Sequence, residues 1–225
     1  DYIDLYQIHW PQRQTNYFGK LNFINNQEDE NKIIDNIFES YETLNNLIIS
    51  GKVRTIGLSN DTSWGVMKFI EIAKQKSLHK IVTVQNPYSL LNRLYEINMS
   101  EISQMENVKL LAYSPLGFGI LTGKYLKASP KNARLTLWKR FDRYSNKNSK
   151  KATVKYIEIA KKFGISPTQM ALSFVNQQPF ITSNIVGATN ITQLKENINS
   201  IGIKLSDEIL KEIELIHTQY PNPAP

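Results

Sequence analysis

The chain has 225 residues, of which 41% are hydrophobic and 21% charged, and its formal net charge is +7. This composition is typical of a soluble globular protein that is long enough for one α/β domain. The absence of cysteine excludes disulfides, thiolate metal sites and a cysteine nucleophile, and it fits a reducing compartment, so we expect a cytoplasmic protein. No apolar run approaches the roughly 18 residues that a membrane-spanning helix needs, so we expect no membrane association.

The positive charge is densest over residues 139–155. No aromatic stacking platform or nucleic-acid-binding motif accompanies this stretch, so we expect no nucleic-acid partner and interpret it as a solvated loop and helix face. The alternative interpretation of this stretch is that its clustered lysines lie near a phosphate-bearing ligand.

Short runs rich in Ile, Val and Leu alternate with amphipathic segments along the chain. The runs predict strands at residues 2–8, 54–58, 81–84, 109–112 and 184–186. Apolar residues repeat at helical spacing over residues 33–48, 66–73, 156–163, 191–201 and 209–216. Gly51 follows the first helical segment, where a left-handed cap is expected. Ser166 and Pro167 are predicted to be the N-cap and the first residue of a helix. Asp207 and Glu208 place negative charge at the start of the last helix.

A regular alternation of strands and helices predicts either an open doubly wound sheet or a closed barrel. A dinucleotide-binding open sheet typically shows GxGxxG after an early strand, and this sequence has none. We therefore predict an α/β fold of the (β/α)8 TIM-barrel type, in a single domain over residues 1–225. Because such a barrel needs eight strands, the chain would supply five with their helices and a C-terminal helix. The sequence opens on a strand-like run and not on Met, so we expect the other three strands upstream.

Polar or aromatic residues follow each predicted strand, at the strand ends where a barrel builds its site. The segments are His9-Trp10-Pro11, Ser59-Asn60, Gln85-Asn86-Pro87-Tyr88, Tyr113-Ser114-Pro115-Leu116-Gly117 and Gly187-Ala188-Thr189-Asn190. Any one of them alone could be a capped strand end, but five in succession indicate a site.

These side chains suit a planar heteroaromatic ligand that carries phosphates. Asn60 and Gln85 each offer a donor and an acceptor that match a carboxamide, and Tyr113 offers a ring for stacking. Gly187 precedes a helix whose first N–H groups could hold an anion. The first turns of that helix place three polar side chains on one face: Gln193, Glu196 and Asn197. The acidic Glu196 suits the amino or hydroxyl donors of an adenosine.

In this order and spacing, the motifs resemble those of the aldo-keto reductases, in particular the branch of the Tas protein and the potassium-channel β subunits. Asp4-Leu5-Tyr6-Gln7-Ile8 before His9 and Gly57-Leu58 before Ser59 belong to the same pattern, and the likeness covers essentially all 225 residues. The resemblance implies a (β/α)8 barrel and an enzyme that reduces aldehydes or ketones to alcohols by hydride transfer from NADPH.

The resemblance also implies roles for individual residues. Ser59, Asn60 and Gln85 would hold the nicotinamide carboxamide, and Tyr113 would stack on the ring. The loop over the pyrophosphate would include Ser114, Leu116, Gly117, Gly119 and Lys124, with Arg134 as a further candidate for phosphate contact. The adenosine end, with its 2′-phosphate, would be surrounded by Gly187, Thr189, Gln193, Glu196 and Asn197.

The family's reaction uses a Tyr general acid with a Lys and an Asp, and a His that orients and polarises the substrate. Only the His has a counterpart here, His9, which can donate one hydrogen bond to a carbonyl; the other three would lie upstream, so we expect this chain alone to be inactive. Trp10 would wall the substrate pocket, with ordinary core packing as the alternative, and Trp64 and Trp138 are interpreted as packing residues. His79 and His217 have no partners at metal-ligand spacing, so we expect no metal site.

Three functions follow from this pattern: a truncated reductase, a non-catalytic NADPH-binding regulatory module, and a vestigial product that binds nothing. The residues specify neither the natural substrate nor the oligomeric state. An open five-stranded sheet has two unpaired edges, and the strand at residues 2–8 would expose one of them as an apolar edge. We therefore expect the isolated chain to be poorly stable, aggregation-prone or dependent on the missing part.

Overall fold

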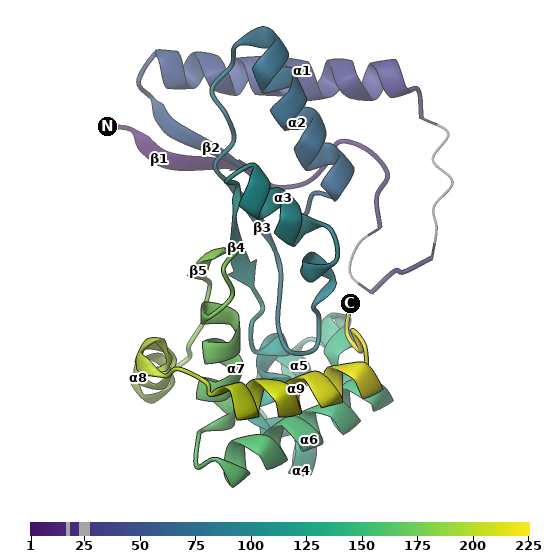
Figure 1. Ribbon diagram of the computed structural model, residues 1–225, viewed down its shortest axis with the longest axis vertical. Helices are drawn as coiled ribbons and strands as arrows, with labels where there is room; N and C mark the ends of the chain where they lie inside the picture. Colours follow the sequence, from purple (N-terminus) through teal and green to yellow (C-terminus); the bar gives the residue numbers. More distant parts are fainter. Residues whose placement is uncertain (17–18, 23–27) are drawn as a thin grey trace. The chain divides into compact units, whose positions relative to one another are not determined.

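The computed structural model describes residues 1–16, 19–22 and 28–225, apart from the side chains of residues 139–141 (Figure 1). Over these described residues, five strands form one sheet in the order β1-β2-β3-β4-β5. Their bounds are β1 (Ile3–Ile8), β2 (Val53–Ser59), β3 (Thr83–Pro87), β4 (Lys109–Tyr113) and β5 (Ile181–Asn184). β1 pairs with β2 and β2 with β3 in parallel, with Ile3 opposite Val53 and Gly57 opposite Thr83. The predicted α/β fold class is confirmed, and five strands in chain order fit part of a (β/α)8 barrel.

The helices follow the strands along the chain. The α-helices are α1 (Glu30–Ile49), α2 (Ser63–Lys76), α3 (Met99–Met105), α4 (Lys124–Lys127), α5 (Arg134–Leu137), α6 (Lys147–Lys162), α7 (Pro167–Asn176), α8 (Ile191–Asn199) and α9 (Asp207–Gln219). The 3-10 turns are η1 (Leu94–Glu96), η2 (Gly117–Thr122), η3 (Lys139–Ser145) and η4 (Ser200–Gly202). Within the described part of the chain, no helix is long and apolar enough to cross a membrane.

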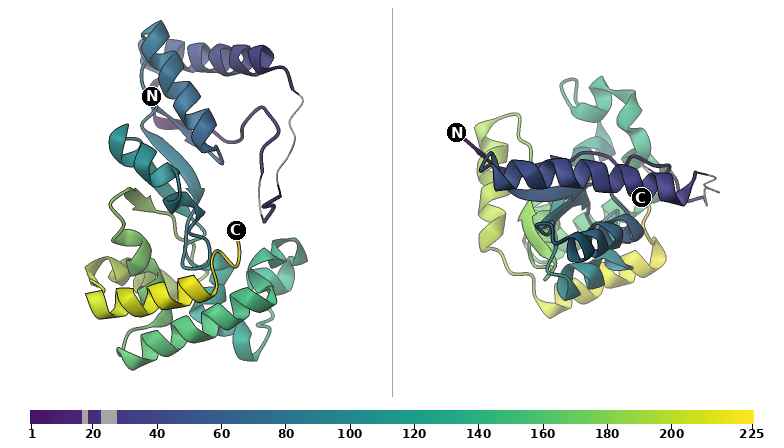
Figure 2. Two further views of the ribbon diagram at one scale, coloured as in Figure 1. Left: turned by 45° about the vertical axis from the view of Figure 1, so that its right-hand side comes forward. Right: turned by 90° about the horizontal axis from the view of Figure 1, so that it is seen from above.

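The chain divides into two compact units, of which the first comprises residues 1–86 and 96–111. In this unit α1 and α2 pack side by side (Figures 1 and 2). Tyr41 of α1 is fully buried, and its ring lies 5.2 Å from that of Phe69 on α2. The Tyr41 hydroxyl donates to the backbone carbonyl of His79 at 2.7 Å, and His79 itself is exposed. Gly51 follows α1 with φ +72°, which confirms the predicted left-handed cap.

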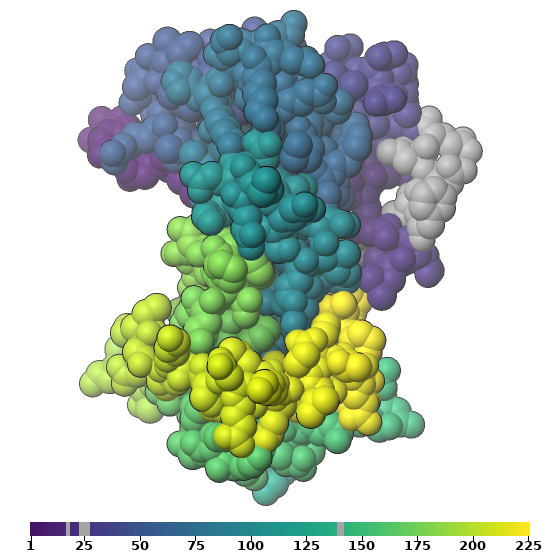
Figure 3. Space-filling view, in the orientation of Figure 1, coloured from purple at the N-terminus to yellow at the C-terminus, as the bar shows by residue number. Residues whose placement is uncertain are grey.

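The second unit comprises residues 87–95 and 112–225. Its core includes Tyr88, which stacks on Phe174 at 6.0 Å and meets Phe180 edge-on at 5.3 Å. α9 packs against α6 and presents its other face to solvent (Figure 3), where Leu215 is 72% exposed. The C-terminal tail is fixed to the same unit, since the Ala224 amide donates to the Leu91 carbonyl at 3.0 Å.

Two strands differ in position from their predicted ranges. β3 starts at Thr83 and continues through the polar Gln85, because backbone pairing with β2 does not depend on side-chain polarity. β5 ends at Asn184, although Ile185 still donates its amide to Ala112 at 2.8 Å. The predicted strand at 184–186 therefore begins three residues and ends two residues too late: the strand itself is partly polar and exposed, while the apolar Ile185 and Val186 lie beyond it.

Three side chains differ from their predicted roles. Ser166 stands at the N-cap of α7 before Pro167, but its hydroxyl donates to Glu196 and does not cap the helix. Trp64 and Trp138 are 42% and 49% exposed, so the packing interpretation of both is wrong. Trp64 lies in the first turn of α2, where the Arg13 guanidinium is 5.0 Å from its ring centroid, and a cation over the face stabilises a half-exposed ring.

Candidate functional site

The first unit brings four of the predicted site residues together at the ends of β1, β2 and β3. The Ser59 hydroxyl and the Asn60 amide both donate to the Gln85 carbonyl, at 2.9 and 3.1 Å. The Asn60 side-chain amide donates to the carbonyl of His9 and to the Ser59 hydroxyl, each at 3.0 Å. Because parallel strands end at one edge of the sheet, residues far apart in sequence meet at this corner.

Asn60 has left-handed backbone geometry, with φ +57°. Asparagine tolerates this conformation better than other residues with a Cβ. The bend turns the chain out of β2, and it lets the side chain reach back to β1 at His9. The side chain of Gln85 is half-buried beside the corner. An amide, a hydroxyl and a second amide side chain are therefore gathered within one small polar region, which fits a ligand carboxamide.

His9 and Trp10 follow β1 directly. His9 is exposed, while Trp10 is half-buried, and their ring centroids lie 6.4 Å apart at an interplanar angle of 86°. An exposed imidazole at the end of a strand can donate to a carbonyl group of a ligand. The adjacent indole provides apolar area at the same point.

The second unit holds the other predicted residues, beginning with Tyr113 at the end of β4. Burial raises the pKa of Tyr113 to about 12, although the nearby Arg143 charge acts in the opposite direction. The phenol therefore stays neutral at ordinary pH. A neutral Tyr113 is better suited to stacking on a ligand than to exchanging protons with it.

A left-handed segment follows Tyr113. Ser114, Gly117, Phe118 and Gly119 have φ of +57°, +54°, +55° and +91°. A Cβ on Gly119 would lie only 2.8 Å from Cε of Lys124, so a glycine here allows that lysine to pack over the loop. Leu116 precedes the two glycines and closes the turn through its carbonyl, which accepts from the Gly119 amide at 2.9 Å.

Positive charge gathers over this segment. The Arg134 guanidinium lies 5.2 Å from the Phe118 ring centroid, and that of Arg143 lies 5.7 Å from it. Desolvation and the charge of Arg134 lower the pKa of Lys124. A neighbouring anion would favour the charged form of this lysine. The residues present thus fit the phosphate groups of a dinucleotide.

The remaining predicted residues lie around the start of α8. Asn190 caps the helix by accepting from the Gln193 amide, and the Gln193 side chain accepts from the Thr189 amide and hydroxyl at 3.0 and 3.1 Å. The buried Asn197 donates to the Gly187 carbonyl at 3.4 Å, which ties the preceding loop to the helix. Glu196 accepts from the Ser166 hydroxyl and is thereby oriented as an acceptor.

Sequence reasoning missed several residues that the structure places beside the predicted ones. Arg143 contacts Tyr113 and Tyr144 from within the irregular stretch after β4, where no spacing pattern marks it. Asp61 and Arg13 form a buried ion pair next to Asn60. Asp61 could have been found because it directly follows Ser59-Asn60, whereas nothing in the sequence marks Arg13.

Comparison with known proteins gives one consistent result. The model of the aldo/keto reductase family matches residues 1–217. The chain is 50% identical over its full length to the protein tas of Escherichia coli (strain K12), and it spans 64% of the length of that protein. It is 34% identical, over 99% of its length and 83% of the relative's, to an aldo-keto reductase of Babesia bovis. Over 76% of its length it is 30% identical to a putative voltage-gated potassium channel subunit beta of Schizosaccharomyces pombe, of which it covers 52%.

Proposed function

The chain belongs to the aldo/keto reductase family, and from this premise we propose that it supplies the cofactor-binding part of an NADPH-dependent reductase of aldehydes and ketones. The observation that carries the proposal is the polar corner of the first unit, where Ser59, Asn60 and Gln85 are held together by hydrogen bonds of 2.9–3.1 Å. Bound NADPH would supply the hydride that reduces a carbonyl carbon.

Each group of residues has a separate task in this proposal. The Asn60 corner orients the nicotinamide carboxamide, and Tyr113 offers its neutral ring for stacking. Lys124 and the left-handed loop around Gly119 hold phosphate, supported by the charge of Arg134. The start of α8, with Gly187, Thr189, Gln193, Glu196 and Asn197, surrounds the adenosine end and its 2′-phosphate.

His9 is proposed to donate a hydrogen bond to the substrate carbonyl, with Trp10 beside it as an apolar wall. A donor at this point polarises the carbonyl and favours hydride addition. Protonation of the resulting alkoxide needs a positioned acid, whose contribution is about 10²–10⁴-fold in rate. We assign no residue of this chain to that acid.

A titration of the chain with NADPH, followed by nucleotide fluorescence, tests the proposal. We expect saturable binding that the Lys124→Met variant weakens about ten- to a hundredfold, because a hydrogen bond to a charged group contributes about 1.5–3 kcal/mol. The Lys211→Met variant removes the same charge from the exposed side of α9 and should bind as the unchanged chain does. Equal affinity of both variants would contradict the assignment of Lys124.

A second function, NADPH binding without turnover, is favoured by two observations. We assign only the histidine of the family's four reaction residues to this chain, and one relative is named as a putative potassium channel subunit beta. The two functions differ in one assay, the oxidation of NADPH in the presence of an aldehyde by the native protein. Loss of absorbance at the nicotinamide band supports the reductase, whereas tight binding with no loss supports the regulatory module.

A further inference from the structure

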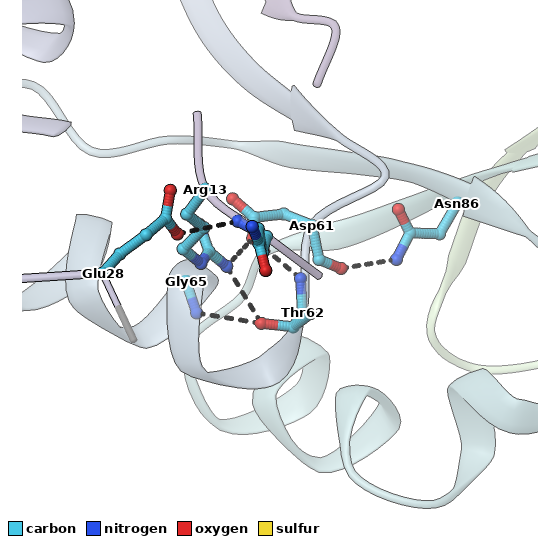
Figure 4. A network of polar contacts seen from close by, with 7 residues as sticks. Arg13, Glu28, Asp61, Thr62, Gly65 and Asn86 are labelled. Atoms are coloured by element: carbon cyan, nitrogen blue, oxygen red, sulfur yellow. Dashed lines mark hydrogen bonds and ion pairs between the residues drawn. The ribbon is translucent and has the colours of Figure 1, made fainter. Parts of the chain in front are cut away.

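A buried ion pair joins the segment that leaves β1 to the start of α2. Nη2 of Arg13 lies 2.5 Å from Oδ1 of Asp61, and the two side chains are only 6% and 4% exposed (Figure 4). A buried pair of this kind is sensitive to the loss of one partner, because the other charge is then left in the interior without compensation.

Both partners make further contacts within the first unit. Asp61 Oδ1 also accepts from the Thr62 amide at 2.8 Å, and Arg13 Nη2 donates to the Thr62 hydroxyl at 3.0 Å. Thr62 is the N-cap of α2, where its hydroxyl accepts from the Gly65 amide at 3.3 Å. The Asn86 side chain donates to the Asp61 carbonyl at 2.9 Å, so the end of β3 is held at the same point.

The packing around the pair requires a glycine at position 65. A Cβ on Gly65 would lie 2.1 Å from Asp61 Oδ1 and 2.3 Å from Arg13 Nη2, so a larger residue here would have to displace the paired side chains. Gly65 lies in the first turn of α2, and glycine has a low intrinsic helix propensity. The residue is therefore explained by the ion pair that it makes room for.

Two adjacent residues thus hold the segment after β1 at two points. Asn60 donates its side-chain amide to the carbonyl of His9 at 3.0 Å, and Asp61 binds Arg13 four residues further on. Between these points lie Trp10 and the buried Pro11. The backbone of the segment is therefore fixed at both ends relative to the corner formed by β2 and β3.

We propose that Arg13 and Asp61 are positioning residues, which hold the imidazole of His9 and the indole of Trp10 beside the Ser59–Asn60 corner. The functional importance of that position rests on the proposed function. The position itself can be tested without ligand, because the chain contains only three histidines.

The imidazole NMR signals of His9, His79 and His217 provide the test. In the unchanged chain, the carbon-bound ring protons of His9 should be shifted from their free-histidine positions by the indole of Trp10. The centroids of the two rings lie 6.4 Å apart. In Arg13→Gln and Gly65→Ala variants, we expect the His9 signal to move to the free-histidine position while the His79 signal stays in place. An Arg13→Lys variant, which keeps the charge, should recover part of the native shift.

The Arg54→Gln variant is the matched control. Arg54 and Asp4 also form an Arg–Asp pair, at 2.6 Å in the same unit, but their side chains are 62% and 74% exposed. This variant should leave the His9 signal unchanged. An unshifted His9 signal in the unchanged chain, or a native His9 signal in Arg13→Gln, would overturn the proposal.

If Arg13→Gln also shifts His79, the double variant Arg13→Met/Asp61→Leu decides, since apolar pairs often replace buried ion pairs without loss of the fold. Selective loss of the His9 shift in the double variant supports positioning by the pair, and retention of the shift overturns it. NADPH affinity tests the proposed function separately, because His9 and Trp10 are assigned to the carbonyl substrate and not to the cofactor. An unchanged chain that binds no NADPH would refute the proposed function, while the histidine spectra would still decide the positioning role.

Discussion

The exposed edge strand β1 leads to a quantitative prediction about self-association. Within the described sheet β1 pairs only with β2, and on its residues Ile3 and Tyr6 are 50% and 43% exposed. Full burial of a large apolar side chain contributes about 1.5–3 kcal/mol, so covering the exposed half of each residue is worth roughly 1 kcal/mol. Two residues on each of two chains give about 4 kcal/mol, which corresponds to about a thousandfold in an association constant.

We therefore expect the Ile3→Lys/Tyr6→Lys variant to associate about a thousandfold more weakly than the unchanged chain, because lysines on an edge strand oppose pairing with a second edge. Sedimentation velocity over a concentration series at fixed ionic strength measures the change. The matched control is Met105→Lys/Leu215→Lys, which adds the same charge at helix positions that are 79% and 72% exposed. The reasoning fails if both double variants associate equally, or if the unchanged chain is monomeric and melts cooperatively.

Three further predictions concern single residues. Asn60→Ala should be less stable than Asn60→Gly by about 1–2 kcal/mol, because only the former keeps a Cβ at φ +57°; equal urea midpoints would contradict the left-handed geometry. Burial raises the pKa of Tyr41 to about 12, above its unfolded value near 10. The contribution of the neutral phenol to the free energy of unfolding is therefore complete below about pH 10 and is lost as the pH rises towards 12. The Tyr41→Phe variant should therefore show a shallower loss of stability over that pH range, and an unchanged alkaline profile would refute the assignment. Gly119→Ala should weaken NADPH binding by displacing Lys124, whereas Gly202→Ala, which has open space around it, should not; equal titrations would argue against a role for the loop.

Much of the fold could be predicted because apolar runs coincide with strands in β1, β2 and β4, although of these only β2 and β4 contain buried residues. β5 was misplaced because its residues are partly polar and exposed, while the adjacent Ile185 and Val186 carry the apolar signal without being buried. Periodicity alone does not reveal which apolar side chains the tertiary structure covers.

The candidate site was predictable to the extent that it lies at strand ends. Ser59, Asn60 and Gln85 could be named because each follows an apolar run, and the structure brings them within hydrogen-bonding distance. Arg13 and Arg143 could not be named, since both lie in irregular segments and act through contacts between residues distant in sequence. The role of Gly65 could not be predicted either, because the reason for a glycine there is the ion pair of Arg13 and Asp61 beside it.

Hydrogen exchange of the chain with and without NADPH tests the central claim most directly, because it reports on both units at once. We expect added protection at residues 59–60 and 85 in the first unit and at residues 114–124 and 187–197 in the second, with no change in α9. Protection confined to other segments, or none at saturating NADPH, would contradict the assignment of the cofactor site.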